Sequence, residues 1–79
     1  MNLNDFIKKF ASEFEETDAN VIKNNTIFKE IDEWSSMVVL SVIGMVNKVY
    51  QVRLKADDFR KVSTVEELFN LIVERKKNV

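Results

Sequence analysis

The segment 37–46 constrains the fold of this chain more than any other feature. It contains no charged residue, and the first charge after it is Lys48. The run is longer than a typical strand and does not alternate, so it predicts a helix that begins at Ser35 or Ser36 and ends near Tyr50. Its many β-branched residues lower its intrinsic helix propensity. This helix must therefore be stabilised by burial on several sides.

Apolar residues at helical spacing predict another helix near the N-terminus. It is expected over residues 3–14, with Asn2 or Asn4 as its cap and with lysine, serine and glutamate on its polar side. Its apolar side comprises Leu3, Phe6, Ile7, Phe10 and Phe14. This is the pattern of an amphipathic helix with one buried face.

The C-terminal part of the chain predicts one short helical turn and one longer helix. Residues 57–61 place acids first and bases last, as the helix dipole favours. Ser63 and Glu66 have the spacing of a capping box, so the last helix is expected to start there and to run to about Lys76. The basic residues 75–77 would then lie at the negative end of this helix and face solvent.

The segment between Glu15 and Trp34 has no sustained period and is rich in residues that favour turns. A connection of this length in a compact domain is usually a functional loop or a disordered segment. Phe28, Ile31 and Trp34 recur at a spacing of three and are expected to anchor its second half on the core. In the later connection, two apolar residues between Gln51 and Ala56 are expected to point inward, namely Val52 and Leu54.

These elements predict a single all-α domain over residues 1–79. The expected architecture is a small four-helix bundle with three main helices, one short helix and a long first loop. The helix that follows Ser35 is expected to bury a stripe of Val39, Val42, Ile43, Val46, Val49 and Tyr50. The predicted core of the whole domain comprises Phe6, Phe10, Val39, Ile43, Val46, Leu68, Phe69 and Ile72.

Composition excludes several classes of function. The chain has no cysteine and no histidine, which removes the usual general base and the commonest metal ligands, so neither an autonomous enzyme nor a metal site is expected. Twelve basic residues against thirteen acidic ones argue against a nucleic-acid partner. The first residues do not resemble a signal peptide, and the apolar run is shorter than the roughly 20 residues that span a bilayer. We therefore expect a cytoplasmic protein without a transmembrane segment.

A serine stands where the polar loop turns into the apolar helix. Ser36 at this junction is either an ordinary helix cap or an attachment point for a phosphorylated group, since the first turn of a helix favours anions. Its hydroxyl is a poor nucleophile by itself, and the chain has no histidine to activate it. A modification at Ser36 would therefore be made by another enzyme.

The order of these elements, together with the junction, resembles the acyl carrier protein family from Leu3 to Val73. The family's mark is Asp-Ser-Leu at the start of the second helix, and residues 35–37 read Ser-Ser-Met here. The acidic and aromatic residues 33–34, the aromatic Tyr50 and the helix opening 64–68 are also similar to the family. Serine in place of aspartate before the acceptor, and a second helix without acids, depart from the family's pattern.

The resemblance implies a function as a carrier. Ser36 would bear 4′-phosphopantetheine, attached by a phosphopantetheinyl transferase, and Ser35 would cap the helix, with Ser35 as acceptor the alternative register. The arm would hold an acyl group as a thioester and deliver it between acyl-loading and acyl-receiving enzymes, as in fatty acid or lipid biosynthesis. A monomer is expected. The family's acyl site, between the second helix and the short helix, corresponds here to Leu40, Ile43, Leu54, Phe59 and Val62.

A second row of residues on the same helix has two interpretations. Met37, Leu40 and Gly44 lie beside the predicted buried stripe, with Lys48 one turn further on. They either add to the core or form a surface on which partner enzymes dock, because the helix has more apolar surface than one stripe needs. The competing function is a small helical interaction module that is never modified.

Overall fold

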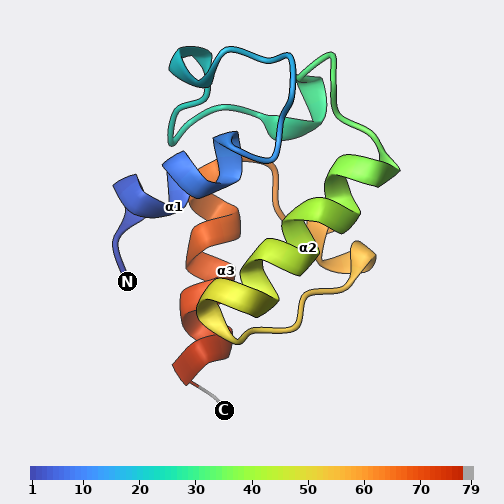
Figure 1. Cartoon of the computed structure of the whole chain (residues 1–79). Helices are drawn as coiled ribbons and strands as arrows, with labels where there is room; N and C mark the ends of the chain where they lie inside the picture. The colour runs from blue at the N-terminus through green and yellow to red at the C-terminus, as the bar shows by residue number, and fades with distance from the viewer. Residues whose placement is uncertain (78–79) are drawn as a thin grey trace.

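The computed structural model describes residues 1–77 and shows a helical protein with long connections (Figure 1). Its regular elements are α1 (Leu3–Ala11), η1 (Ala19–Val21), η2 (Phe28–Glu30), α2 (Ser36–Tyr50), η3 (Ala56–Arg60) and α3 (Val65–Lys77), where η denotes a 3₁₀ turn. The predicted helical class is confirmed for these residues. The short helix of the expected bundle is the 3₁₀ turn η3, so three α-helices and not four build the described part of the chain.

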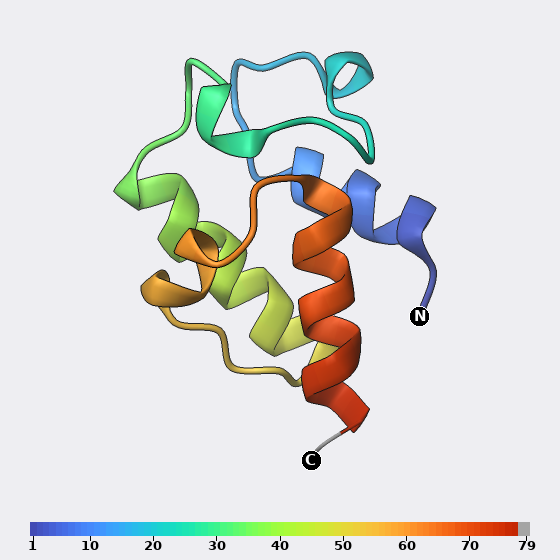
Figure 2. The same cartoon turned by 180° about the vertical axis from the view of Figure 1, so that it is seen from behind.

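The three α-helices surround one core. Helix α1 contacts both α2 and α3, and η3 packs on α2. The connection between α1 and α2 covers one end of the helices, as the views from both sides show (Figures 1 and 2). The N-terminus of α2 therefore lies beside this long connection, while its C-terminus lies at the opposite end of the protein.

Helix α1 is shorter than the predicted span of 3–14. Asn2 caps it, since its side-chain oxygen accepts a hydrogen bond from the Asp5 amide at 3.1 Å. The helix ends at Ala11, where the Ser12 hydroxyl donates to the Lys9 carbonyl and competes with the helical hydrogen-bond pattern. Phe14 is nevertheless buried. The apolar spacing thus continues beyond the helix, and this is why the pattern overestimates its length.

Helix α2 has the predicted bounds, but its buried face differs by about one residue from the predicted stripe. The most buried row is Val38, Val42, Val46 and Tyr50, whereas Val39 and Ile43 are only half-buried and Val49 is exposed. A helix that is apolar on nearly every side has no sharp period, so its pattern does not fix which side faces the core. Because of this shift, the predicted core residues Val39 and Ile43 are only half-buried. Phe69 of α3 is half-buried as well, while Phe6, Phe10, Val46, Leu68 and Ile72 are confirmed as buried.

Hydrogen bonds hold the second half of the long connection to the start of α3. The Val65 amide donates to the Thr26 carbonyl at 3.1 Å, and the Phe28 amide donates to the Ser63 carbonyl at 3.3 Å. This is an isolated β-bridge between Ile27 and Thr64. The predicted anchors lie on the core, with Phe28 fully buried and Ile31 and Trp34 half-buried.

Helix α3 starts one residue later than its predicted capping box. Thr64 is the cap: its hydroxyl accepts from the Glu67 amide at 3.1 Å, and the Glu67 carboxylate accepts from the Thr64 amide at 3.0 Å. The prediction of Ser63 with Glu66 was therefore wrong by one position. Glu66 instead accepts a hydrogen bond from the side chain of Asn24, which again ties the long connection to α3.

The basic end of α3 is partly engaged within the protein, contrary to the expectation that it faces solvent. Arg75 forms two hydrogen bonds to the carboxylate of Asp58 at 2.8 and 2.6 Å, and the Asp58 residue is buried. Lys76 donates to the Tyr50 carbonyl at 2.7 Å, at the C-terminal end of α2. These contacts hold α3 to η3 and to the end of α2. The predicted inward side chains Val52 and Leu54 between them are buried, as expected.

Candidate functional site

The two neighbouring serines at the start of α2 have different roles. Ser35 has an extended backbone, with φ −157° and ψ 172°, and its hydroxyl accepts a hydrogen bond from the Val38 amide at 3.4 Å. Its carbonyl accepts the first helical hydrogen bond, from the Val39 amide at 3.0 Å. Ser36 is the first residue of the helix and is exposed. The cap is therefore made by Ser35, which leaves the Ser36 hydroxyl free of that role.

The surroundings of Ser36 favour a negative charge. The first amides of an α-helix lack partners within the helix and, with the helix dipole, create a positive potential at its N-terminus. The first turn of α2 contains no acidic residue. Two basic side chains, Lys29 of η2 and Arg60 of η3, lie with Ser36 around one surface hollow. The free amides of the first turn and the two basic residues of the same hollow together suit an anionic group at this position.

This hollow, which we call the Ser36 hollow, has a volume of about 330 Å³. It lies between α2, η2 and η3, and its lining is mostly apolar. The lining residues are Lys29, Trp34, Ser36, Val39, Leu40, Ala56, Phe59 and Arg60. Trp34 and Phe59 are neighbours in its wall, with ring centroids 5.9 Å apart. An apolar group attached at Ser36 would therefore have apolar side chains of the same hollow to pack against.

The five residues expected to line an acyl site are only partly brought together. Leu40 and Phe59 both line the Ser36 hollow. Leu54 is buried, and Ile43 and Val62 are half-buried, away from the lining of that hollow. Trp34 and Val39 also line the Ser36 hollow, although the sequence did not predict either residue to be part of an acyl site. The signal for Trp34 was its position directly before the serine pair, but it was interpreted only as an anchor of the loop.

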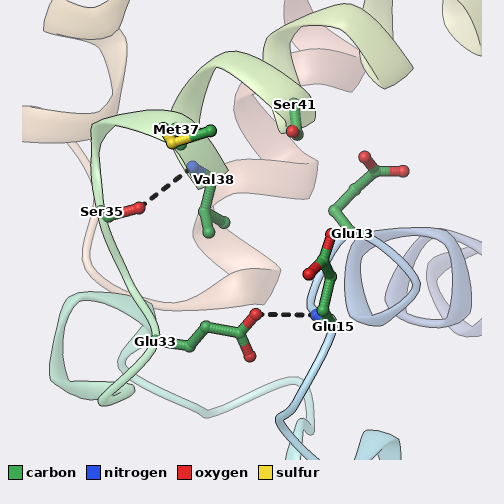
Figure 3. A pocket seen from close by; sticks show the side chains of 7 residues that line it. All are labelled: Glu13, Glu15, Glu33, Ser35, Met37, Val38 and Ser41. Carbon is green, nitrogen blue, oxygen red and sulfur yellow. Dashed lines mark hydrogen bonds between the residues drawn. The ribbon is translucent and has the colours of Figure 1, made fainter.

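A second hollow lies on the other side of the first turns of α2 (Figure 3). It measures about 220 Å³ and is lined by Glu13, Glu15, Glu33, Ser35, Met37, Val38 and Ser41. We call it the acidic hollow. Although the first turn of α2 has no acids, three glutamates of the long connection thus line this hollow with Ser35 and Met37. The sequence did not predict this arrangement because Glu13 and Glu15 are far from Ser36 along the chain, and Glu33, three positions before Ser36, was interpreted only as part of the lead-in to the helix.

Glu33 fixes the geometry of the connection before the site. Its carboxylate accepts hydrogen bonds from the amides of Glu15, Glu16 and Thr17, at 2.7, 3.1 and 2.9 Å, and from the Thr17 hydroxyl at 2.7 Å. These bonds, led by the one from the Thr17 hydroxyl, lower the pKa of Glu33 below its ordinary value of 4.5. Glu33 therefore joins the segment after α1 to the segment that leads into Ser36.

The candidate docking residues of α2 all lie on the surface. Met37 is 76% exposed and Leu40 is 66% exposed, so neither adds to the core. Gly44 and Lys48 are exposed as well. A Cβ atom placed on Gly44 would meet nothing within 4 Å, so no neighbouring group requires glycine there. The exposed side of α2 thus offers two large apolar side chains, Met37 and Leu40, close to Ser36 in the helix.

Comparisons with known proteins give no family for this chain, since no family model, curated protein or solved structure matches it. Among the helices of residues 1–77, none combines the length and the apolar character needed to cross a membrane.

Proposed function

We propose that this protein is an acyl carrier that bears 4′-phosphopantetheine on Ser36. The observation that supports the proposal most is the division of roles between the two serines, because Ser35 caps α2 and leaves an exposed hydroxyl at Ser36. The phosphodiester would lie against the first amides of α2 and near Lys29 and Arg60. The arm would supply the thiol that the chain lacks and hold cargo as a thioester.

Under this proposal the protein is a substrate and a shuttle, and not an enzyme. A phosphopantetheinyl transferase would modify Ser36, and acyl-loading and acyl-receiving enzymes would then dock beside it. Met37 and Leu40 offer these partners exposed apolar contacts, and the glutamates of the acidic hollow offer charges for a basic partner. The acidic contacts thus come from outside α2, in contrast to the family's usual pattern.

Intact mass spectrometry tests the proposal. The protein is incubated with coenzyme A and a broad-specificity phosphopantetheinyl transferase, and a gain of one phosphopantetheinyl group is expected. Ser36→Ala should abolish the gain. Ser35→Ala should retain it, at a cost of about 1 kcal/mol in stability from the lost cap. Ser63→Ala is the control, since Ser63 is an exposed serine outside α2 that lines neither hollow.

Two outcomes would contradict the proposal. Modification that survives Ser36→Ala but disappears with Ser35→Ala would move the acceptor to Ser35. The absence of any modification, with several transferases, would favour the second candidate function, an unmodified interaction module. The exposure of Met37 and Leu40 is the observation that favours this second function, because such side chains suit a protein partner with or without an arm.

A further inference from the structure

The Ser36 hollow combines an apolar lining with two cations. Trp34, Leu40 and Phe59 supply its large apolar side chains, and Lys29 and Arg60 come to it from two different turns. None of the described residues that line it is acidic. A site of this composition suits a ligand with an apolar body and an anionic end.

The charge of Arg60 is only partly compensated within the protein. Its Nη1 atom lies 2.9 Å from the carboxylate of Asp57, and both side chains are largely exposed. A guanidinium has five N–H donors, so one carboxylate contact leaves donors for a second anion. Lys29 lies near the face of the Phe28 ring, 6.0 Å from its centroid, an arrangement that leaves the ammonium group accessible.

The opposite side of α2 has the reverse charge. The acidic hollow presents glutamates beside Ser35 and Met37 (Figure 3). A group that extends from Ser36 and ends in an anion would be repelled on that side and attracted to the Ser36 hollow. The interaction energy is favourable with the cations of one hollow and unfavourable with the glutamates of the other, and salt weakens both interactions. The two hollows therefore direct an anionic group to one side of the helix.

We propose that the Ser36 hollow binds medium-length acyl groups that end in a carboxylate, with the chain against Leu40 and Phe59 and the carboxylate paired with Lys29 or Arg60. The volume of about 330 Å³ lies at the low end of the range for ligand pockets, which fits one such chain. The statement that this group is the carrier's cargo rests on the proposed function. The preference of the hollow for an amphipathic anion is independent of the proposed function.

The first arm of the test uses the unmodified protein and free ligands. Octanoate and octan-1-ol are titrated at low salt while the fluorescence of Trp34, the single tryptophan, is recorded. Octanoate is expected to bind more tightly than octanol. Lys29→Gln and Arg60→Gln should each weaken octanoate binding by about three- to five-fold and leave octanol binding unchanged. Lys8→Gln, at an exposed lysine of α1 that lines neither hollow, is the matched control and should have no effect.

The second arm uses the protein loaded on Ser36 with either an octanoyl or a suberoyl group. These cargoes have the same number of carbons and differ by the terminal carboxylate. The suberoyl form is expected to melt at a higher temperature, to shift the Trp34 and Phe59 NMR signals more, and to lose both differences in the Lys29→Gln, Arg60→Gln double variant. Equal behaviour of the two cargoes, or equal binding of octanoate and octanol, would overturn the inference. Cation variants that affect both cargoes equally would also overturn it, because the cations would then serve the arm and not the carboxylate.

The two proposals fail in different ways. The free-ligand arm uses the unmodified parent protein, so its result does not depend on whether Ser36 can be modified. If no transferase modifies Ser36 while octanoate still binds as expected, the carrier proposal fails and the preference of the hollow stands. If Ser36 is modified but neither arm shows a preference for the carboxylate, this inference fails alone.

Discussion

Replacing Arg75 with methionine should destabilise this protein strongly, although Arg75 stands in a run of basic residues near the end of the chain. The substitution keeps much of the side-chain volume but removes both hydrogen bonds to Asp58, which are 2.8 and 2.6 Å long. The side chain of Asp58 is only 5% exposed, so it would remain as a buried carboxylate without its main partner. Its remaining contacts are the Lys55 amide at 2.8 Å and the ammonium of Lys61 at 3.6 Å.

The size of the effect follows from this geometry. Removing one partner of a fully buried ion pair costs about 3–5 kcal/mol. Arg75 is 34% exposed and Lys61 stays close, so water and Lys61 would compensate part of the loss. We expect a decrease of about 2–3 kcal/mol in the free energy of unfolding, which is a large part of the roughly 3–5 kcal/mol that a core of this size supplies. The melting temperature should fall by roughly 10–20 °C.

Urea denaturation followed by Trp34 fluorescence measures this change, because Trp34 packs against Phe28 with ring centroids 4.8 Å apart. The matched control is Arg60→Met, which breaks an ion pair whose side chains are 80% and 75% exposed and should cost no more than about 1 kcal/mol. Adding Asp58→Asn to Arg75→Met should recover part of the loss, since it removes the unpaired charge. If Arg75→Met unfolds at the same urea concentration as Arg60→Met, the ion pair does not hold η3 to α3 as described.

Three further predictions concern the interior of α2, its C-terminal end and the acid dependence of stability. Gly44→Ala should raise the free energy of unfolding by about 0.5–1 kcal/mol, because a Cβ at this exposed helical position meets nothing within 4 Å. A thermal or urea titration measures the change, and a decrease would mean that α2 needs glycine there. Gln51→Gly should also stabilise the protein, by about 0.5–1 kcal/mol, because Gln51 ends α2 with a positive φ of 56°. An unchanged midpoint of urea unfolding would show that the hydrogen bond between Gln51 and Lys76 offsets the backbone strain. Stability should be constant near neutral pH and should fall below about pH 5, because the folded pKa values of Glu33, Glu67 and Asp58 lie below their ordinary values, so protonation favours the unfolded chain. Glu33→Gln should flatten this acid dependence in urea titrations at a series of pH values, and an identical pH profile would contradict the role given to Glu33.

Local sequence determined the helices and the position of the serine junction. The apolar run 37–46 admits little besides a buried helix, and the polar residues before it place the start of that helix at the serine pair. Asn2 and Ser35 cap their helices through contacts within three residues. Because such interactions are local, the sequence narrowed the caps to neighbouring candidates, Asn2 or Asn4 for α1 and Ser35 or Ser36 for α2. The same holds for the burial of Phe6 and Phe10, which share one face of a short amphipathic helix.

Patterns alone did not fix features that depend on a choice between nearly equal local alternatives. Serine and threonine are both good caps, so residues 63–67 offer two capping boxes one position apart, and pairing with residues 24–28 accompanies the later one. The buried face of α2 is another case, because a helix with apolar residues on several sides has no preferred orientation of its own. Its neighbours α1 and η3 decide that Val38 and Val42 point inward, while Val39 and Leu40 remain for the Ser36 hollow.

Only the tertiary structure decided the electrostatic contacts. Asp58 and Arg75 are 17 positions apart, as are Glu16 and Glu33, and no periodicity relates residues at such distances. An ion pair of this kind forms where the packing of apolar helices happens to bring two charges out of water, and its geometry exists only after that packing. The sequence therefore determined where an exposed serine begins a helix, and the tertiary structure decided which charges surround it.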